Sequence, residues 1–544
     1  MTPARTSRFS VPLALPWLCV LCAAYLLPGL AGHDPWKSDD AIGFGIAFEA
    51  LNGQWLVPAL AGEPYPEASP LYFWIAAILA KLASAVLPLH AGARLASGTF
   101  AAIAIVCAGL AARELFGSAA ANSAALILIG CIGLLLHAHS MTAEIAVLAA
   151  LSAVFLGIAI VPRRPGLGGG LAGGGIGAMF LAKGFAPAVA GLLIVAVLTL
   201  ALPGMRRRAA RFWIVLAAVM LPCASIWPFA LYHAAPERLA DWWIHSNLVN
   251  LPGTSSAPFV SQILSYLRLL GWFAWPALPL ALWSLWIYRH RLTHPGIVLP
   301  VAGFAVLLVM LGFGRDAREV TALPLLLPLS LLGAAAVGEL RRGAANALDW
   351  FSMMTFSLFA LALWVGYAAM LTGLPAELAN RFATLEPGFA AKFSPFAFSL
   401  AIAYSAMWVL LVTGAGRSNY RGVTHWAAGM TLAWGLLVAL WVPWVDYGKS
   451  YRGMSAALAP HVNPRACVSS RNLGEPQRAS LHYFIGLVTL RADGGPVRCP
   501  LLLVQGSVSD DTGNPGRGWD LVWQGNRPGD RVERYRLYRR NQTF

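Results

Sequence analysis

The sequence predicts an all-α polytopic membrane protein with about 13 transmembrane helices and some juxtamembrane helices, followed by a small α/β domain. The first observation is compositional: 58% of the 544 residues are hydrophobic, 12% are charged, and the mean hydropathy is +0.64. Soluble proteins carry about a quarter charged residues, so a chain this poor in charge needs lipid as the solvent for most of its surface. This composition excludes a cytosolic enzyme, a disordered chain and a secreted disulfide scaffold.

The second observation is the distribution of positive charge. The formal net charge is +15, from 39 Lys and Arg against 24 Asp and Glu. Basic residues in membrane proteins gather in cytoplasmic loops, and we expect no nucleic-acid partner because no basic stretch is interleaved with aromatic residues. The basic clusters lie at residues 1–8, 113, 163–164, 206–211, 289–291, 341–342 and 417–421.

Two crossings fit between consecutive clusters if each cluster is cytoplasmic. The first apolar segment is long for a signal peptide, so we interpret it as an uncleaved span with the N-terminus in the cytoplasm. An odd number of spans leaves the C-terminus outside. The expected spans are 11–31, 94–112, 116–137, 145–161, 167–181, 185–202, 212–232, 264–288, 297–313, 320–337, 351–371, 396–413 and 424–445.

The apolar segment 71–89 is the exception to this scheme. Counting it as a span would place Arg113 and every later cluster on the wrong side of the membrane. We therefore expect an amphipathic or re-entrant helix near the outer interface. The transmembrane domain then covers residues 1–445, and its first periplasmic loop with juxtamembrane helices covers 32–90.

Residues 446–544 form a polar, turn-rich segment that we expect to be a soluble periplasmic domain. Its strand-like runs lie at 501–505, 521–524 and 534–538. It contains two cysteines, Cys467 and Cys499. In an oxidising compartment these two predict a disulfide.

Carboxylates stand at the outer rim of the predicted bundle. Asp39 and Asp40 follow the first span in a loop rich in Trp and Tyr, and Glu144 begins a later span at its outer end. Ionisable residues near membrane depth are costly and are functional candidates. The alternative, a solvated loop or helix end, is equally compatible with Glu144.

Cations accompany these carboxylates on the same predicted side. Lys183 separates two short apolar segments, and Arg315 and Arg318 precede the span at 320–337. Lys183 alternatively snorkels to the interface, and the arginines alternatively form a rim salt-bridge cluster. Carboxylates beside Lys and Arg suit a donor with a phosphate leaving group, because a carboxylate can accept a proton and cations can offset the charge on the departing phosphate.

The first loop reads Asp39-Asp40, then Gly-Gln-Trp-Leu-Val-Pro at 53–58, Gly-Glu-Pro-Tyr at 62–65 and Glu-Ala-Ser-Pro-Leu-Tyr-Phe-Trp at 67–74. It resembles the GT-C class of polytopic glycosyltransferases, which includes protein O-mannosyltransferases and aminoarabinose–lipid A transferases. The match covers about 35 residues in order. Ala-Lys-Gly at 182–184 and Arg-Glu-Val-Thr-Ala-Leu-Pro at 318–324 extend the resemblance over roughly the first 340 residues.

The resemblance implies an inverting transfer of a sugar from a polyprenyl-phosphate donor, on the outer face of the bacterial inner membrane. The acceptor would be lipid A, another envelope glycan or a protein hydroxyl. It implies Asp39 as the general base, with Asp40 and Glu144 as further acidic site residues. Lys183, Arg318 and, beside it, Arg315 would bind the donor phosphate.

The resemblance further implies that the site can hold a divalent metal, for which Glu67 and His245 are the candidate ligands; no other cofactor is implied. The chain departs from the family pattern in several places. Asp40 stands where glutamate is usual, Ala68 and Ser69 replace a Lys-Pro pair, and Glu144 replaces an aspartate.

Two other classes of function remain open from the sequence. A transporter or flippase of lipid-linked sugars would place charges near the bilayer midplane and show repeated halves, whereas here the charges lie at one rim. A non-enzymatic scaffold would use the C-terminal domain to bind partners.

Overall fold

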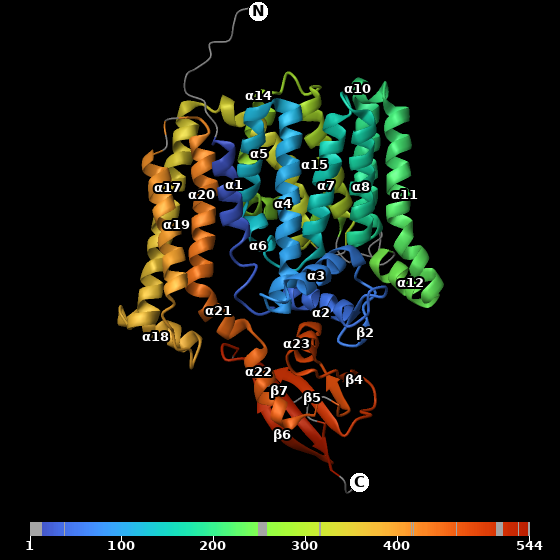
Figure 1. The fold of residues 1–544 in the computed structure, drawn as a ribbon, viewed down its shortest axis with the longest axis vertical. Helices are drawn as coiled ribbons and strands as arrows, with labels where there is room; N and C mark the ends of the chain where they lie inside the picture. Colours follow the sequence, from blue (N-terminus) through green and yellow to red (C-terminus); the bar gives the residue numbers. More distant parts are fainter. Residues whose placement is uncertain are drawn as a thin grey trace, which may run out of the picture.

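The computed structural model describes residues 13–36, 38–247, 258–314, 317–414, 416, 418–463, 465–507, 515–530 and 532–541. A bundle of long helices makes up most of the molecule, and a small sheet domain lies beyond one end of it (Figure 1). Within the described residues, eight helices are long and apolar enough to cross a membrane, or up to nine if one bent pair counts as a span. The predicted fold class is therefore confirmed.

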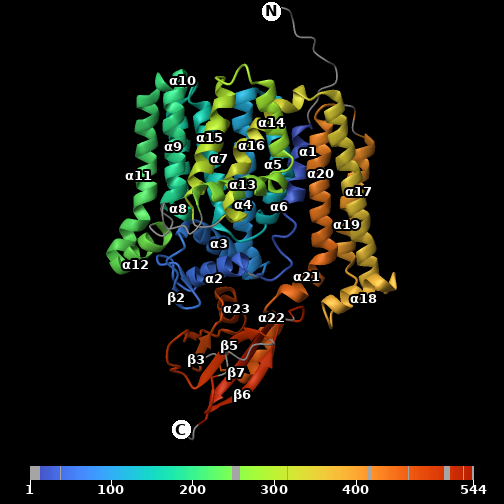
Figure 2. The same cartoon turned by 180° about the vertical axis from the view of Figure 1, so that it is seen from behind.

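The candidate spans are single helices or consecutive helical segments. They are α4 (Leu89–Phe116), α7 (Ala143–Ile160), α11 (Ala209–Ala234), α15 (Pro295–Gly312), η3 (Val320–Leu325) with α16 (Leu326–Ala336) and η4 (Val337–Glu339), α17 (Arg342–Thr372), α19 (Pro395–Gly414), and α20 (Arg421–Leu436) with η5 (Leu437–Trp441) and α21 (Val442–Lys449). Shorter helices stand among or beside them (Figures 1 and 2). These are α1 (Leu15–Leu26), α5 (Ser118–Gly130), α6 (Ile132–His137), α8 (Pro165–Lys183), α9 (Phe185–Ala201), α10 (Pro203–Arg206), α12 (Pro236–Trp242), η1 (Trp243–Asn247) and α18 (Ala376–Leu385).

The span predicted at 264–288 is not one straight helix. It is divided into α13 (Phe259–Phe273) and α14 (Ala277–Ile287), which meet at an angle of 103°. Pro276 stands at the break. Proline has no amide hydrogen and disfavours a helical conformation in the residue before it, so the apolar run ends one helix and begins another. Hydropathy alone could not reveal this bend.

Helices α2 (Asp39–Leu51) and α3 (Pro70–Ala83) lie across the end of the bundle that faces the sheet domain (Figure 1). The 14 residues of α3 span about 21 Å at 1.5 Å per residue. This is shorter than the roughly 30 Å hydrocarbon core of a bilayer. The length of α3 agrees with the expectation that segment 71–89 does not cross the membrane, which stays a prediction. Between α2 and α3 the chain forms the hairpin of β1 (Ala59–Leu60) and β2 (Glu63–Pro64).

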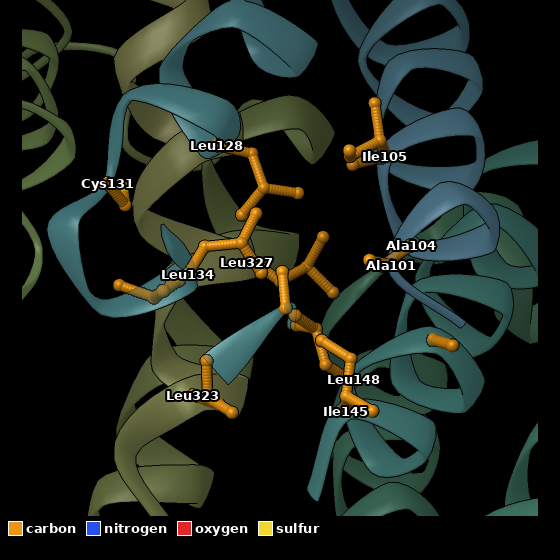
Figure 3. Close-up of a cluster of buried hydrophobic side chains, with 14 of the residues drawn as sticks. Ala101, Ala104, Ile105, Leu128, Cys131, Leu134, Ile145, Leu148, Leu323 and Leu327 are labelled. Atoms are coloured by element: carbon orange, nitrogen blue, oxygen red, sulfur yellow. The ribbon is translucent and has the colours of Figure 1, made fainter. Parts of the chain in front are cut away.

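Buried apolar side chains from four neighbouring parts of the bundle meet at its centre (Figure 3). They come from α4, from the α5–α6 pair, from α7 and from the η3–α16 run. In lipid, such helices associate through close packing rather than through a hydrophobic driving force. Because α6 and α7 both contribute side chains to this cluster, the packing fixes the two ends of the turn between them. The cluster includes Ala101, Ala104, Ile105, Leu128, Cys131, Leu134, Ile145, Leu148, Leu323 and Leu327.

Helix α8 is rich in glycine and packs against its neighbours backbone to backbone. A Cβ atom added to Gly173 would lie 2.3 Å from the carbonyl oxygen of Leu216 in α11, and one added to Gly175 would lie 2.6 Å from that of Ala150 in α7. Small residues allow membrane helices to approach this closely. The contacts fix the position of α8, whose last residue is Lys183.

The C-terminal domain contains a five-stranded sheet in the order β4-β3-β5-β7-β6. Strand β3 is parallel to β4 and β5, whereas β7 is antiparallel to β5 and β6. The three predicted strand-like runs fall in β5, β6 and β7, and Cys467 and Cys499 are joined as a disulfide. The elements are α22 (Arg452–Leu458), η6 (Ala459–His461), β3 (Val468–Arg471), α23 (Glu475–Ile485), β4 (Leu490–Arg491), β5 (Leu501–Ser507), β6 (Trp519–Gly525) and β7 (Glu533–Arg540).

We predict that Gly173→Leu destabilises the protein by about 3 kcal/mol, because the new side chain is forced against the backbone of α11. Gly174→Leu is the matched control, since the nearest atom to an added Cβ there is Val219 Cγ1 at 3.8 Å. Thermal unfolding of the two purified variants in detergent measures the difference. Equal melting temperatures would contradict this account of α8 packing.

Candidate active site

The buried carboxylate of Asp40 ties the start of α2 to the bundle. It lies 2.8 Å from Nη2 of Arg94 in α4, and it accepts backbone hydrogen bonds from Met141 at 2.9 Å and Trp36 at 3.2 Å. Arg94 is fully buried. Burial alone would raise the pKa of Asp40, but the charge and hydrogen bonds of Arg94 hold that pKa below its usual value.

Asp39, the first residue of α2, has a more open environment than Asp40. It is partly exposed. Within the described part of the chain, its carboxylate accepts one hydrogen bond, from Ser38 Oγ at 3.4 Å. Of the two adjacent aspartates, Asp40 is therefore held by the fold, whereas Asp39 is accessible to a ligand.

Glu144 and Lys183 form an ion pair at the same end of the bundle. Glu144 lies in the first turn of α7 and Lys183 ends α8, and the distance from Lys183 Nζ to Glu144 Oε1 is 2.7 Å. The Glu144 side chain is 12% exposed and that of Lys183 is 42% exposed, so the ammonium is the more accessible partner. Gly184, with a φ of +76°, ends α8 directly after the lysine.

The predicted cations and carboxylates lie within electrostatic range of one another. Lys183 interacts with Glu144, with Asp39 and, repulsively, with Arg318. Arg318 is exposed at the start of the η3–α16 run. The structure therefore brings Asp39, Glu144, Lys183 and Arg318 together at one end of the bundle, whereas Arg315 lies outside the described residues.

His137 is a further member of this cluster that was not among the predicted site residues. It ends α6 and interacts electrostatically with Glu144, Glu319 and Asp39. Its Nε2 atom is buried and has no hydrogen-bond partner among the described residues. The signal in the sequence was a histidine at the outer end of an apolar span, seven residues before Glu144.

The candidate metal ligands do not form a metal-binding group. Across the described ranges, no group of three or more His, Cys, Asp or Glu side chains has a geometry that could hold a metal ion. His245 Nδ1 lies 2.8 Å from the carbonyl oxygen of Asp241, and Glu67 interacts with the hydroxyl of Tyr65. Within the described residues, Glu67 and His245 are therefore not part of a group of three ligands, and no chemical step is assigned to a metal.

A cavity of about 360 Å³ lies between the β1–β2 hairpin and helices α11 and α12. Its lining combines aromatic and charged side chains, among them Trp227, Trp242, Glu63, Arg238 and His245. Flat apolar rings with a few polar groups are typical of small-ligand sites. Trp242 also packs on Phe180 at 5.8 Å between ring centroids, which links the cavity to the last turn of α8.

No family model matches the chain. The chain is 29% identical over 436 residues to the undecaprenyl phosphate-α-4-amino-4-deoxy-L-arabinose arabinosyl transferase of Pseudomonas paraeruginosa, over 76% of this chain and 73% of that protein. Its fold matches that of ArnT from Cupriavidus metallidurans. The TM-score is 0.72 for the apo structure and 0.71 for the complex with undecaprenyl phosphate, at 18% identity and over 96% of this chain and 98% and 97% of those chains.

The chain is homologous to these aminoarabinose transferases and shares the fold of ArnT. The resemblance of the first loop is thus supported over most of the chain length. Between the enzyme and the transporter alternatives, homology to sugar transferases favours the enzyme. The clustering of charges at one end of the bundle, away from its middle, agrees with that choice.

We predict that Asp40→Asn destabilises the protein by about 3 to 5 kcal/mol, because it leaves the buried charge of Arg94 without its partner. The pKa of Asp40 is depressed in the folded state, so the stabilisation is present above the unfolded value of about 4. It is lost as the pH falls through the lower folded value.

The stability difference between wild type and Asp40→Asn should therefore be full near neutral pH and shrink below about pH 4. Thermal unfolding of both proteins over a pH series tests this. A difference that stays constant down to the lowest pH would contradict the proposed role of the Arg94 pair.

Proposed function

We propose that this glycosyltransferase moves a sugar from a polyprenyl-phosphate donor to an acceptor at the outer face of the bacterial inner membrane, with inversion at the anomeric carbon. The acceptor is lipid A or another envelope glycan or protein hydroxyl. Relatives named as undecaprenyl phosphate aminoarabinose transferases support this class of donor. The observation that carries the proposal is the grouping of Asp39, Glu144, Lys183 and Arg318 at one end of the bundle.

In the proposed reaction, Asp39 is the general base. Its carboxylate accepts the proton of the acceptor hydroxyl as the acceptor oxygen forms a bond to the anomeric carbon. The bond between that carbon and the phosphate oxygen breaks, and the electron pair leaves with the polyprenyl phosphate. One displacement of this kind inverts the configuration at the anomeric carbon.

The leaving phosphate gains one negative charge in this step. The exposed ammonium of Lys183 and the guanidinium of Arg318 supply positive charge where it develops. Glu144 orients Lys183 through their 2.7 Å contact. A phosphate acceptor such as that of lipid A would attack without losing a proton, so the base role of Asp39 belongs to a hydroxyl acceptor.

The proposed orientation places the N-terminus in the cytoplasm and the C-terminal domain in the periplasm. The basic segment around α10 and the C-terminal domain lie at opposite ends of the molecule (Figure 1). Arginines at 206–208 are typical of a cytoplasmic loop. The disulfide of the sheet domain suits an oxidising compartment.

We expect Asp39→Asn to lower the rate of sugar transfer by about 10²- to 10⁴-fold, because the amide cannot accept the proton. Mass spectrometry of lipids and envelope glycans, with and without the gene, identifies the product, and the variant is then assayed on that product. Asp520→Asn, at an exposed position in the sheet domain, serves as the control. Wild-type activity in Asp39→Asn would remove Asp39 as the base.

Glu144 and Lys183 should behave as one unit. We expect Glu144→Gln and Lys183→Met each to lower the rate of transfer by about tenfold or more. The double variant should lose little beyond the worse single variant, because the effects of substitutions at contacting residues are not additive. Steady-state kinetics of the three variants measures the coupling. Fully additive losses would show that the two side chains act independently.

A further inference from the structure

The outer face of α2, the helix that begins with Asp39, is covered by α23 of the C-terminal domain. Gly45 in the middle of α2 allows this approach: a Cβ atom added there would lie 2.7 Å from the Cβ of Ala479 in α23 and 2.5 Å from Leu60 Cδ1. Phe44 packs on Tyr483 with ring centroids 4.6 Å apart. The two helices therefore cross with almost no space between them.

The last turn of α2 is bound to the same helix of the domain. Glu49 is 5% exposed, accepts a hydrogen bond from the amide of Gly62 at 2.6 Å, and lies 3.1 Å from Nδ1 of His482 in α23. Burial would raise the pKa of Glu49, but the His482 and Gly62 hydrogen bonds hold it below its usual value. The carboxylate is therefore ionised and its contact with α23 is charge-assisted.

The segment that leads into α2 is held by the start of the C-terminal domain. Asp34 is buried and accepts hydrogen bonds from Arg452 Nε at 2.9 Å and Ser450 Oγ at 2.6 Å. Trp36 donates from its indole to Asp446 at 2.7 Å. Residues on both sides of Asp39 are thus fixed by residues that follow position 445.

We propose that the C-terminal domain is a positioning element of the active site, with Ala479 and His482 as positioning residues that set the place of Asp39 through α2. The proposal rests on the proposed function of Asp39. Helix α2 is one rigid rod of 13 residues, so displacement by α23 at Gly45 and Glu49 is transmitted to its first residue. The groups proposed to bind phosphate, Lys183 and Arg318, belong to the bundle and stay in place.

The first test is steric and includes a rescue. Gly45→Ala should displace α2 from α23 and lower kcat by about 10- to 100-fold, since misplacing a reacting group by about 1 Å costs that much. The KM for the donor should stay within about twofold. Adding Ala479→Gly to Gly45→Ala removes the clashing methyl group of α23, whereas the other close atom, Leu60 Cδ1, is the end of a side chain that can rotate away. The double variant should restore most of kcat, and failure of this rescue in a folded double variant would overturn the proposal.

The second test removes the polar contact. His482→Ala should lower kcat while leaving KM for the donor unchanged, and should speed hydrogen exchange of the α2 amides in the full-length protein. His461→Ala is the matched control, because His461 is an exposed histidine of the same domain. Unchanged exchange in α2, or unchanged kcat, would each overturn the proposal.

These readouts separate the proposal from the proposed function. Hydrogen exchange of α2 reports its attachment to α23 whatever reaction the enzyme catalyses. Asp39→Asn tests the base role alone, with the domain contact intact. If Asp39→Asn keeps full activity while His482→Ala loosens α2, the base role of Asp39 fails, and only the attachment of α2 to α23 survives.

Discussion

The buried pair of Asp40 and Arg94 is the constraint on which the site depends. Arg94 is a guanidinium placed inside a helical bundle, and a charge there is tolerated only with a partner and further hydrogen-bond acceptors. Asp40 supplies the partner, and the carbonyl oxygens of Leu30, His33 and Asp34 supply the acceptors. Because Asp40 also accepts the amide of Met141, the pair joins α2, α4 and the turn before Glu144 into one unit.

The acidic residues of the first loop divide according to their partners. Asp34, Glu49 and Glu63 are bound by basic residues of the C-terminal domain, Glu63 by both Arg478 and Arg491. Asp40 is bound by the bundle. Most of the acidic side chains of the loop are thus paired in contacts that hold the structure. Asp39 is not paired with a basic side chain among the described residues, and it lies within electrostatic range of Lys183.

Hydropathy and basic clusters predicted a helical membrane protein with many spans, because both follow from the cost of burying charge in lipid. Of the 13 expected spans, several are short or divided helices among the described residues, as in α1 and the α5–α6 pair. They could not predict the bend at Pro276, which depends on backbone geometry. For the site, spacing and resemblance indicated Asp39, Glu144 and Lys183. They could not indicate that Asp40 is buried and paired while Asp39 stays partly exposed, because the partner of Asp40 is Arg94 on another helix. The contacts of α23 join residues about 410 positions apart, and no local pattern could reveal them.

The separation of these partners along the chain has a consequence for biosynthesis. Asp34 is synthesised 418 positions before Arg452, and proteins fold from the N-terminus as they emerge at about 5 to 20 residues per second. The first loop therefore exists for tens of seconds with its carboxylates lacking their final partners. The ion pairs of Asp34, Glu49 and Glu63 with the C-terminal domain form only after that domain has been made, so a truncated chain that inserts correctly would lack them.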